Sequence, residues 1–121
     1  MRHSFRIKRI YEKATADDGY RVLIDRIWPR GVSKEKANID LWAKEVAPSS
    51  ELRKWFCHKP ERFLVFRETY LNELQLHPEK QEKIAYLKQQ SEQSNVTLLY
   101  AAKDEIHNHA VVLYEYIIET Q

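Results

Sequence analysis

Two groups of charged and polar side chains follow directly after apolar, strand-like runs. After residues 22–24 come Asp25, Arg26, Trp28 and Arg30, and after residues 96–102 come Lys103, Asp104, His107 and Asn108. Arginine offers bidentate donors to carboxylate or phosphate groups, and aspartate or neutral histidine can handle a proton. We therefore expect a site for a small anion. Arg26, Arg30 and Lys103 are its predicted binding groups, and Asp25 or His107 its predicted catalytic groups.

The elements that carry these groups must place them at one edge of a sheet. In open α/β sheets, ligands collect beyond the carboxyl ends of the strands, where loops diverge and helix N-termini offer free N–H donors. Pro29 and Gly31 should shape the first loop, and the small side chains of Ala101 and Ala102 leave room for a ligand. The site requires residues 20–25 and 96–102 to lie side by side and to run in the same direction.

Structural roles compete with each of these assignments. Arg26 and Arg30 could pair with Asp25 and Asp104 and so lock two loops together. Asp25, at the end of a covered strand, should be partly buried and hydrogen-bonded. Likewise, Trp28 could simply close a core, and His107 could be a hydrogen-bonded histidine at the core edge.

Metal, cofactor and thiol chemistry are not expected. His107 and His109 would point about 200° apart on a helix, so they should not chelate one ion. The sequence has two glycines and no Walker, GxGxxG, CxxC or GxSxG motif, so no known cofactor is predicted. Cys57 is the one cysteine. It does not form a nucleophile and base pair with His58, because adjacent residues on a helix diverge by about 100°.

Composition indicates one domain spanning residues 1–121. The chain is 43% hydrophobic and 31% charged, which suits a compact protein with a single core. No run reaches the roughly 18 apolar residues of a membrane span, and the N-terminus lacks the apolar block of a signal peptide, so a cytoplasmic protein is expected.

Charge distribution leaves a second function open. The net charge is +2, yet residues 1–30 hold eight Lys or Arg against four Asp or Glu. This basic quarter favours an anionic partner. A nucleic-acid-associated or regulatory protein is therefore an alternative, although no helix-turn-helix is evident, and a non-catalytic interaction module is another.

Hydrophobic periodicity predicts an α/β fold with about three strands in a small, mostly parallel sheet. The expected strands are residues 4–11, 20–25 and 95–102, and the first two could form an antiparallel hairpin. A long helical insertion separates the second and third strands, with helices at 34–47, 51–56, 60–74 and 78–90. Ser33 is expected to cap the first of these helices, and Ser49 the second. In the third of these helices, Phe63, Phe66, Tyr70 and Leu74 share one stripe. A last helix is expected to begin near Asp104 and to bury Ile106, Ala110, Leu113 and Ile117.

Several motifs in order resemble one known family. They are DRIWPRG, WAKEVAPS, LRKWFCHKP, a phenylalanine and tyrosine spaced as Phe66 and Tyr70, and LLYAAKDEIHNHA. They are similar to the YeaO-like branch of the bacterial domain of unknown function 488 family, over nearly the whole chain. The resemblance implies a small cytosolic α/β protein without an established activity, so whether the chain is an enzyme stays open.

The same resemblance suggests further site residues. The motif positions on this chain are Asp25, Arg26, Trp28, Arg30, Ser49, Arg53, His58, Tyr70, Lys103, Asp104, His107, Asn108 and His109. Arg53 and His58 lie on a helical region that could cover the strand ends as a lid. The predicted ligand-binding residues are therefore Arg26, Trp28, Arg30, Arg53, His58, Lys103, Asp104 and Asn108. Arg53 could equally brace its helix against a carboxylate. Cys57 stands where the family is expected to have glycine.

Overall fold

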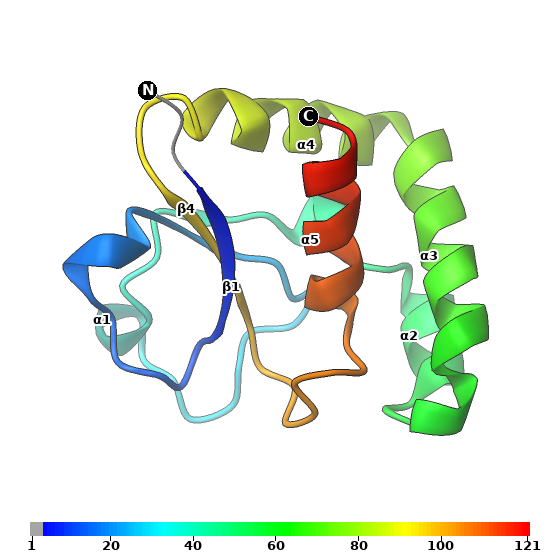
Figure 1. Ribbon diagram of the computed structural model, residues 1–121. Helices are drawn as coiled ribbons and strands as arrows, with labels where there is room; N and C mark the ends of the chain where they lie inside the picture. The colour runs from blue at the N-terminus through cyan, green and yellow to red at the C-terminus, as the bar shows by residue number, and fades with distance from the viewer. Residues whose placement is uncertain (1–3) are drawn as a thin grey trace.

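The computed structural model describes residues 4–121 and contains a four-stranded parallel sheet. The strands are β1 (Phe5–Arg9), β2 (Tyr20–Leu23), β3 (Leu41–Trp42) and β4 (Val96–Tyr100), and their order across the sheet is β1-β4-β2-β3 (Figure 1). Every strand pair is parallel. The α/β class and the mostly parallel sheet are confirmed, but there are four strands rather than about three.

Five α-helices and three short 3-10 helices complete the described chain. The α-helices are α1 (Lys34–Ala37), α2 (Ser50–Phe56), α3 (Phe63–Leu76), α4 (Pro78–Gln90) and α5 (His109–Glu119). The 3-10 helices are η1 (Ala16–Asp18), η2 (Lys44–Val46) and η3 (Pro60–Arg62). Pro78 takes a first helical position, where its missing N–H costs nothing. Within residues 4–121, no helix combines the length and the apolar character needed to cross a membrane.

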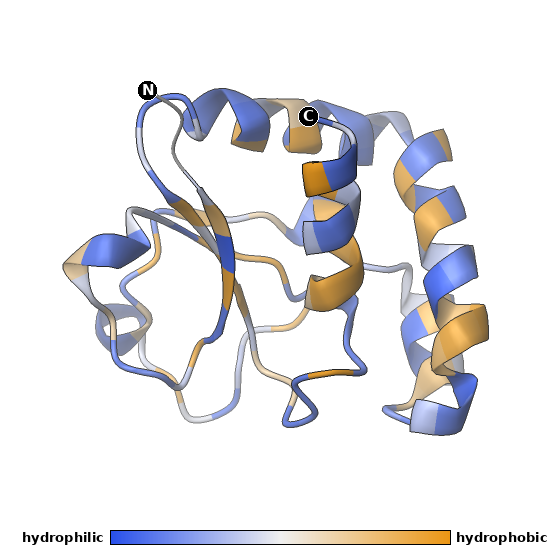
Figure 2. Cartoon of the chain, in the orientation of Figure 1, coloured by the Kyte–Doolittle hydropathy of each residue, from blue (hydrophilic) through white to orange (hydrophobic). Residues whose placement is uncertain are grey.

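Side chains of the two central strands alternate between two hydrophobic cores. Val22 and Leu98 contribute to the larger core, with α3, α4 and α5, whereas Leu23 and Leu99 contribute to a smaller core with Ala37 of α1. Figure 1 shows α1 on one side of the strands and α3 and α5 on the other, and Figure 2 shows hydrophobic residues along the strands and on α5. Because helices cover both faces of the sheet, side chains on both faces of these strands are apolar, and the strands are continuous apolar runs in the sequence.

The predicted stripe of α3 is part of the larger core. Phe66, Tyr70 and Leu74 are buried, and Phe63 is half-buried against the same cluster. This placement confirms the helical periodicity read from the sequence. It also links α3 to η2, because the Tyr70 hydroxyl donates a hydrogen bond to the carbonyl of Val46.

The helix predicted for residues 34–47 is much shorter than expected. Ser33 caps it as predicted, accepting the Lys36 N–H at 3.1 Å, but Asn38 adopts a left-handed conformation and ends it. The chain then forms β3, where Ala43 N–H donates to the Leu23 carbonyl at 2.8 Å. The free edge of β2 takes a partner there, and this tertiary pairing outweighs the local helical preference.

The possible antiparallel hairpin of the first two strands is wrong. β4 lies between β1 and β2 and pairs in parallel with both. All five residues of β4 are buried, so this strand is the centre of the hydrophobic sheet. The central position satisfies its backbone groups on both edges, which burial requires.

The last helix begins at His109 rather than near Asp104. The Asp104 carboxylate accepts the N–H groups of Ile106 and His107, both at 2.9 Å, and so closes a turn ahead of the helix. Asn108 then caps α5 by accepting the Val111 N–H at 3.0 Å. Ile106 is consequently 69% exposed, against the prediction, whereas Ala110, Leu113 and Ile117 are buried as expected.

Candidate functional site

The site lies where the chain leaves β2 and β4. These two strands are adjacent and parallel, with Tyr20 paired to Val96 and Leu23 to Leu99, so the arrangement required for a shared site is present. The segment after β2 runs to the face covered by α1, whereas the segment after β4 runs to α5 on the opposite face. Loops that diverge in this way open a crevice at the carboxyl ends of the strands.

A cavity of about 670 Å³ occupies this crevice. It is within the range of about 300–1,000 Å³ that is typical of small-molecule sites. Its charged and polar lining comprises Asp25, Arg26, Arg30, Arg53, His58, Lys103, Asp104, Asn108 and His109, together with Tyr11. Its apolar lining comprises Ile27, Trp28, Pro29, Ala47, Pro48, Phe56, Phe66, Ala101 and Ala102. All eight predicted ligand-binding residues thus line one cavity, and their binding role stays a prediction.

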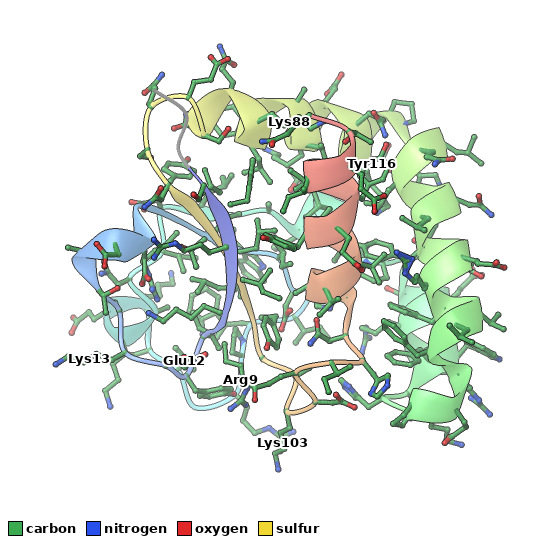
Figure 3. The ribbon with its side chains drawn as sticks, viewed as in Figure 1. Arg9, Glu12, Lys13, Lys88, Lys103 and Tyr116 are labelled. Carbon is green, nitrogen blue, oxygen red and sulfur yellow. The ribbon has the colours of Figure 1, made fainter. Side chains whose placement is uncertain are left out.

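Four of the lining residues form what we call the cationic rim: Arg26, Arg30, Arg53 and Lys103. Arg26 is half-buried and is held by a hydrogen bond from Nε to the Pro48 carbonyl at 3.1 Å. The other three are exposed. Figure 3 shows Lys103 on the loop after β4, at the end of the molecule where Arg9 also lies.

None of the four rim cations forms an ion pair with any residue of the described chain, 4–121. The pairs of Arg26 and Arg30 with Asp25 and Asp104, which the sequence left open, are therefore not formed. Arg53 does not brace its helix to a carboxylate either. The positive charges of the rim are left available to a bound anion.

The loop after β2 is held firmly by its aromatic residue. Trp28 Nε1 donates to the Val32 carbonyl at 2.6 Å, and the indole packs edge-to-face on Trp42 with ring centroids 5.2 Å apart. Tyr11 anchors the same loop, because its hydroxyl donates to the Arg30 carbonyl at 2.9 Å. Trp28 thus closes the smaller core and also forms a wall of the cavity, so both of its predicted roles are compatible.

Asp25 joins three strands and a helix at the base of the cavity. Its Oδ2 accepts the N–H of Ala101 at 3.1 Å, and its carbonyl accepts Trp42 Nε1 at 2.7 Å. Its Oδ1 lies 3.1 Å from Nε2 of His109, the first residue of α5. With a side chain only 17% exposed, Asp25 has the partly buried, hydrogen-bonded environment expected of it.

His109 is one of the family's motif positions, but it is not among the predicted catalytic or ligand-binding residues. It lines the cavity, and its Nε2 also lies 3.1 Å from the Ile24 carbonyl. Its imidazole packs edge-to-face with Tyr70, at a centroid distance of 6.4 Å. The HNHA motif contains this residue, but no local pattern distinguishes His109 from His107, because the partner Asp25 is supplied by a distant strand.

His107 lies outside the cavity lining. Its Nδ1 is 2.9 Å from Asp104 Oδ2, and its ring packs edge-to-face with Phe63 at 5.3 Å. The backbone N–H groups of His107 and Ile106, followed by the His107 side chain, lower the pKa of Asp104 to about 2. Across residues 4–121, no three His, Cys, Asp or Glu side chains cluster as a metal site would require.

The segment around α2 brings Arg53, Phe56 and His58 to the cavity. Ser49 caps α2 by accepting the Leu52 N–H, and its own N–H and hydroxyl donate to Glu73 of α3 at 2.8 and 2.6 Å. After the helix, Cys57 and His58 both adopt left-handed backbone conformations, with φ of 48° and 54°. The two residues are therefore not on a helix, contrary to the geometry assumed from the sequence, and Cys57 is exposed.

The fold and the cavity together describe a small parallel α/β protein with cationic side chains at the carboxyl end of its sheet. The chain belongs to the family whose model is described as "Inactive DUF488-N3 subclade", which matches residues 4–121. The expected resemblance to the YeaO-like family is thereby confirmed.

Two uncharacterised bacterial proteins illustrate the relationship. The chain is 43% identical over 110 residues to "Uncharacterized protein YeaO" of Escherichia coli (strain K12), covering 91% of this chain and 93% of that protein. It is 43% identical over 108 residues to "Uncharacterized protein Rv3073c" of Mycobacterium tuberculosis (strain ATCC 25618 / H37Rv), covering 89% and 88%. No solved structure matches the chain.

Proposed function

We propose that this protein binds a small anionic ligand, phosphate-like or nucleotide-like, in the cavity at the carboxyl ends of β2 and β4. The observation that carries the proposal is the cationic rim, whose four positive charges have no ion-pair partner within residues 4–121. Like charges held together on one cavity repel each other, and a bound anion relieves that repulsion. Guanidinium forks also match the geometry of phosphate and carboxylate oxygens.

The apolar lining supports a ligand with a ring as well as an anionic group. Phe56 and Phe66 are buried and stack with ring centroids 4.3 Å apart, and Trp28 forms another wall. Aromatic walls favour a flat, apolar group, whereas the rim favours phosphate oxygens. A nucleotide carries both features in one molecule, so nucleotides are the first ligands to test.

Binding is favoured over catalysis. The family description calls the subclade inactive, and both carboxylate oxygens of Asp25 lie against neighbouring groups of the protein itself. A carboxylate placed in this way is suited to holding the cavity together. Catalytic roles for Asp25 and His107 remain predictions, and they are not needed for the proposed binding function.

Thermal denaturation in the presence of candidate ligands tests the proposal. The panel contains inorganic phosphate, sugar phosphates, nucleoside mono- and diphosphates, and simple carboxylates. A ligand at about 100 times its Kd stabilises a protein by about 2.7 kcal/mol, which raises Tm by several degrees. We expect such a shift from at least one nucleotide with the wild-type protein and a much smaller one with the Arg26→Ala, Arg30→Ala double variant.

A matched double variant, Arg6→Ala with Lys13→Ala, removes two exposed cations that lie outside the cavity lining. It should keep the full ligand-dependent shift. No stabilisation by any member of the panel, or equal shifts in both double variants, would contradict the proposal. Single-stranded DNA is a further member of the panel, and binding to it that weakens with salt while nucleotides have no effect would favour the nucleic-acid alternative.

A further inference from the structure

One nitrogen of the His109 imidazole, Nε2, contacts two acceptor groups of the protein, and these contacts determine that Nε2 carries a hydrogen. Nε2 lies 3.1 Å from the Ile24 carbonyl and 3.1 Å from Asp25 Oδ1. A carbonyl and a carboxylate are both acceptors, so Nε2 must carry a hydrogen. The Nε2–H bond is directed to the carbonyl, since Asp25 Oδ1 is left as a buried oxygen without an aligned hydrogen bond.

The other nitrogen, Nδ1, is not fully buried, and His109 is one of the residues that line the cavity. Nδ1 has no hydrogen-bond partner within residues 4–121, and it is accessible to solvent rather than buried. The His109 side chain is 15% exposed. Because Nε2 already bears a hydrogen, Nδ1 is the position at which the ring gains or loses its second proton.

Charged groups of opposite sign surround this ring. The Asp25 carboxylate, at the end of β2, stabilises an imidazolium, whereas the cationic rim and the N-terminus of α5 oppose it. Tyr70 on α3 stays neutral, because burial and then the nearby Glu73 and Asp25 raise its pKa well above 10.0. Tyr11, His58 and Asp104 are further ionisable residues that line the cavity.

An anion bound at the rim changes this balance, since it cancels the positive charge that opposes protonation of the ring. We propose that His109 is an anion-binding residue of the cavity, which takes up a proton from solvent on ligand binding and donates Nδ1–H to the ligand while Asp25 serves as its counter-ion. This inference rests on the proposed function and deepens it. It assigns a ligand contact and a pH dependence to the same cavity.

Nuclear magnetic resonance of the histidine side chains in the whole protein tests the inference. The probe is sulfate, whose charge is constant between about pH 5.5 and 8.5, against chloride at equal ionic strength. Sulfate should move the midpoint of the His109 titration to higher pH and leave that of His107 nearly unchanged. In the Arg26→Ala, Arg30→Ala variant the sulfate effect on His109 should be strongly reduced.

The affinity for sulfate provides a second readout. If sulfate binding takes up one proton, the affinity for sulfate falls as the pH rises. The fall is up to about tenfold for each pH unit above the midpoint of the His109 titration in the sulfate-free protein. We expect this slope in the wild-type protein and in His107→Gln, and a flat profile in His109→Gln, whose amide can still donate to the Ile24 carbonyl. Asp25→Asn should lower the sulfate-bound midpoint of His109, because the counter-ion is lost.

The outcomes separate the two proposals. Sulfate that perturbs the resonances of the cavity residues without moving the His109 midpoint would overturn the role of His109 and leave the proposed function standing. The same slope in His109→Gln and the wild-type protein would do so as well. No perturbation of the cavity by any anion, at any pH, would overturn both.

Discussion

The Asp25 carboxylate accepts a hydrogen bond from the Ala101 backbone N–H at 3.1 Å and so links the ends of the two strands that carry the cavity. This contact connects the loop after β2 with the loop after β4. Neither Arg26 nor Lys103 could be placed reliably around one ligand if these loops moved independently. The cavity geometry therefore depends on a contact that is itself structural.

Replacement of Asp25 measures the strength of this link. Asp25→Ala leaves the Ala101 N–H without its acceptor and should lower the free energy of unfolding by about 2 kcal/mol. Asp25→Asn retains an oxygen acceptor and should cost about 1 kcal/mol. Urea denaturation, with unchanged m-values, gives both numbers. Equal losses for the two variants would mean that the hydrogen bond to Ala101 does not hold the loops together.

The two glycines form a matched pair for a test of backbone strain. Both have positive φ, 64° at Gly19 and 77° at Gly31, but a Cβ at Gly19 would lie 2.2 Å from the Asn95 carbonyl oxygen, whereas a Cβ at Gly31 would meet nothing within 4 Å. Gly31→Ala should cost about 1 kcal/mol from the left-handed conformation alone. Gly19→Ala adds a backbone clash and should cost at least about 2 kcal/mol more. Chemical denaturation of both variants compares the two losses of unfolding free energy. An equal or smaller loss in Gly19→Ala than in Gly31→Ala would mean that the close packing at Gly19 does not matter for stability.

Cys57 occupies a position where glycine should be more stable. The residue follows the last turn of α2 with a φ of 48° and is exposed, so its side chain contributes little packing. Glycine accepts this conformation without the steric cost that other residues meet there. Cys57→Gly should therefore stabilise the protein by about 1 kcal/mol, measured by thermal or urea denaturation. The control Lys54→Gly, within α2, should destabilise it by a similar amount, and a loss of stability in Cys57→Gly would contradict the prediction.

Asp18 should make stability dependent on acid pH. Burial alone would raise the pKa of Asp18, but hydrogen bonds from the Thr15 backbone, from Lys8 and from Arg21 outweigh burial and lower the pKa from 3.8 to about 2. Because the pKa of Asp18 is lower in the folded state than in the unfolded state, its carboxylate contributes fully to the free energy of unfolding above about pH 4. This contribution is lost as the pH falls through about 2.

The variant Asp18→Asn tests this dependence. Near neutral pH it should lose about 3 kcal/mol, since it leaves the buried Arg21 guanidinium without its counter-ion. The difference from the wild-type protein should then narrow between about pH 4 and 2, as the wild-type carboxylate is protonated. Asp17→Asn, at the exposed neighbouring position, should show neither effect. A difference that stays constant with pH would show that Asp18 does not titrate in this range.

Elements with a local or strongly periodic signal in the sequence match their predictions. The apolar runs that became β2 and β4, the stripe through Phe66, Tyr70 and Leu74, and the caps at Ser33 and Ser49 are all present in the structure. Burial on both faces also indicated a parallel sheet, and the structure has the parallel pairing of β2 with β4 that the predicted site required. The common location of Arg26, Arg30 and Lys103 follows from that pairing, whereas Arg53 reaches the rim from α2.

Elements whose structure depends on a partner distant in the sequence differ from their predictions. Residues 41–42 lie in a segment predicted to be helical, yet they form β3 because they pair with the otherwise unpaired edge of β2. The position of β4 between β1 and β2 has no local signature either. His109 rather than His107 reaches the cavity because the Asp104 turn delays the start of α5 and sets which side chain faces Asp25.

The sequence by itself determined which residues could bind an anion and which strands had to carry them, because residue chemistry and hydrophobic period are local properties of the chain. Only the tertiary structure decided which of those charges remain unpaired, since an ion pair depends on distances between segments that the chain order does not specify. It paired Asp25 with His109 and Asp104 with His107, and so left the four rim cations without partners in residues 4–121.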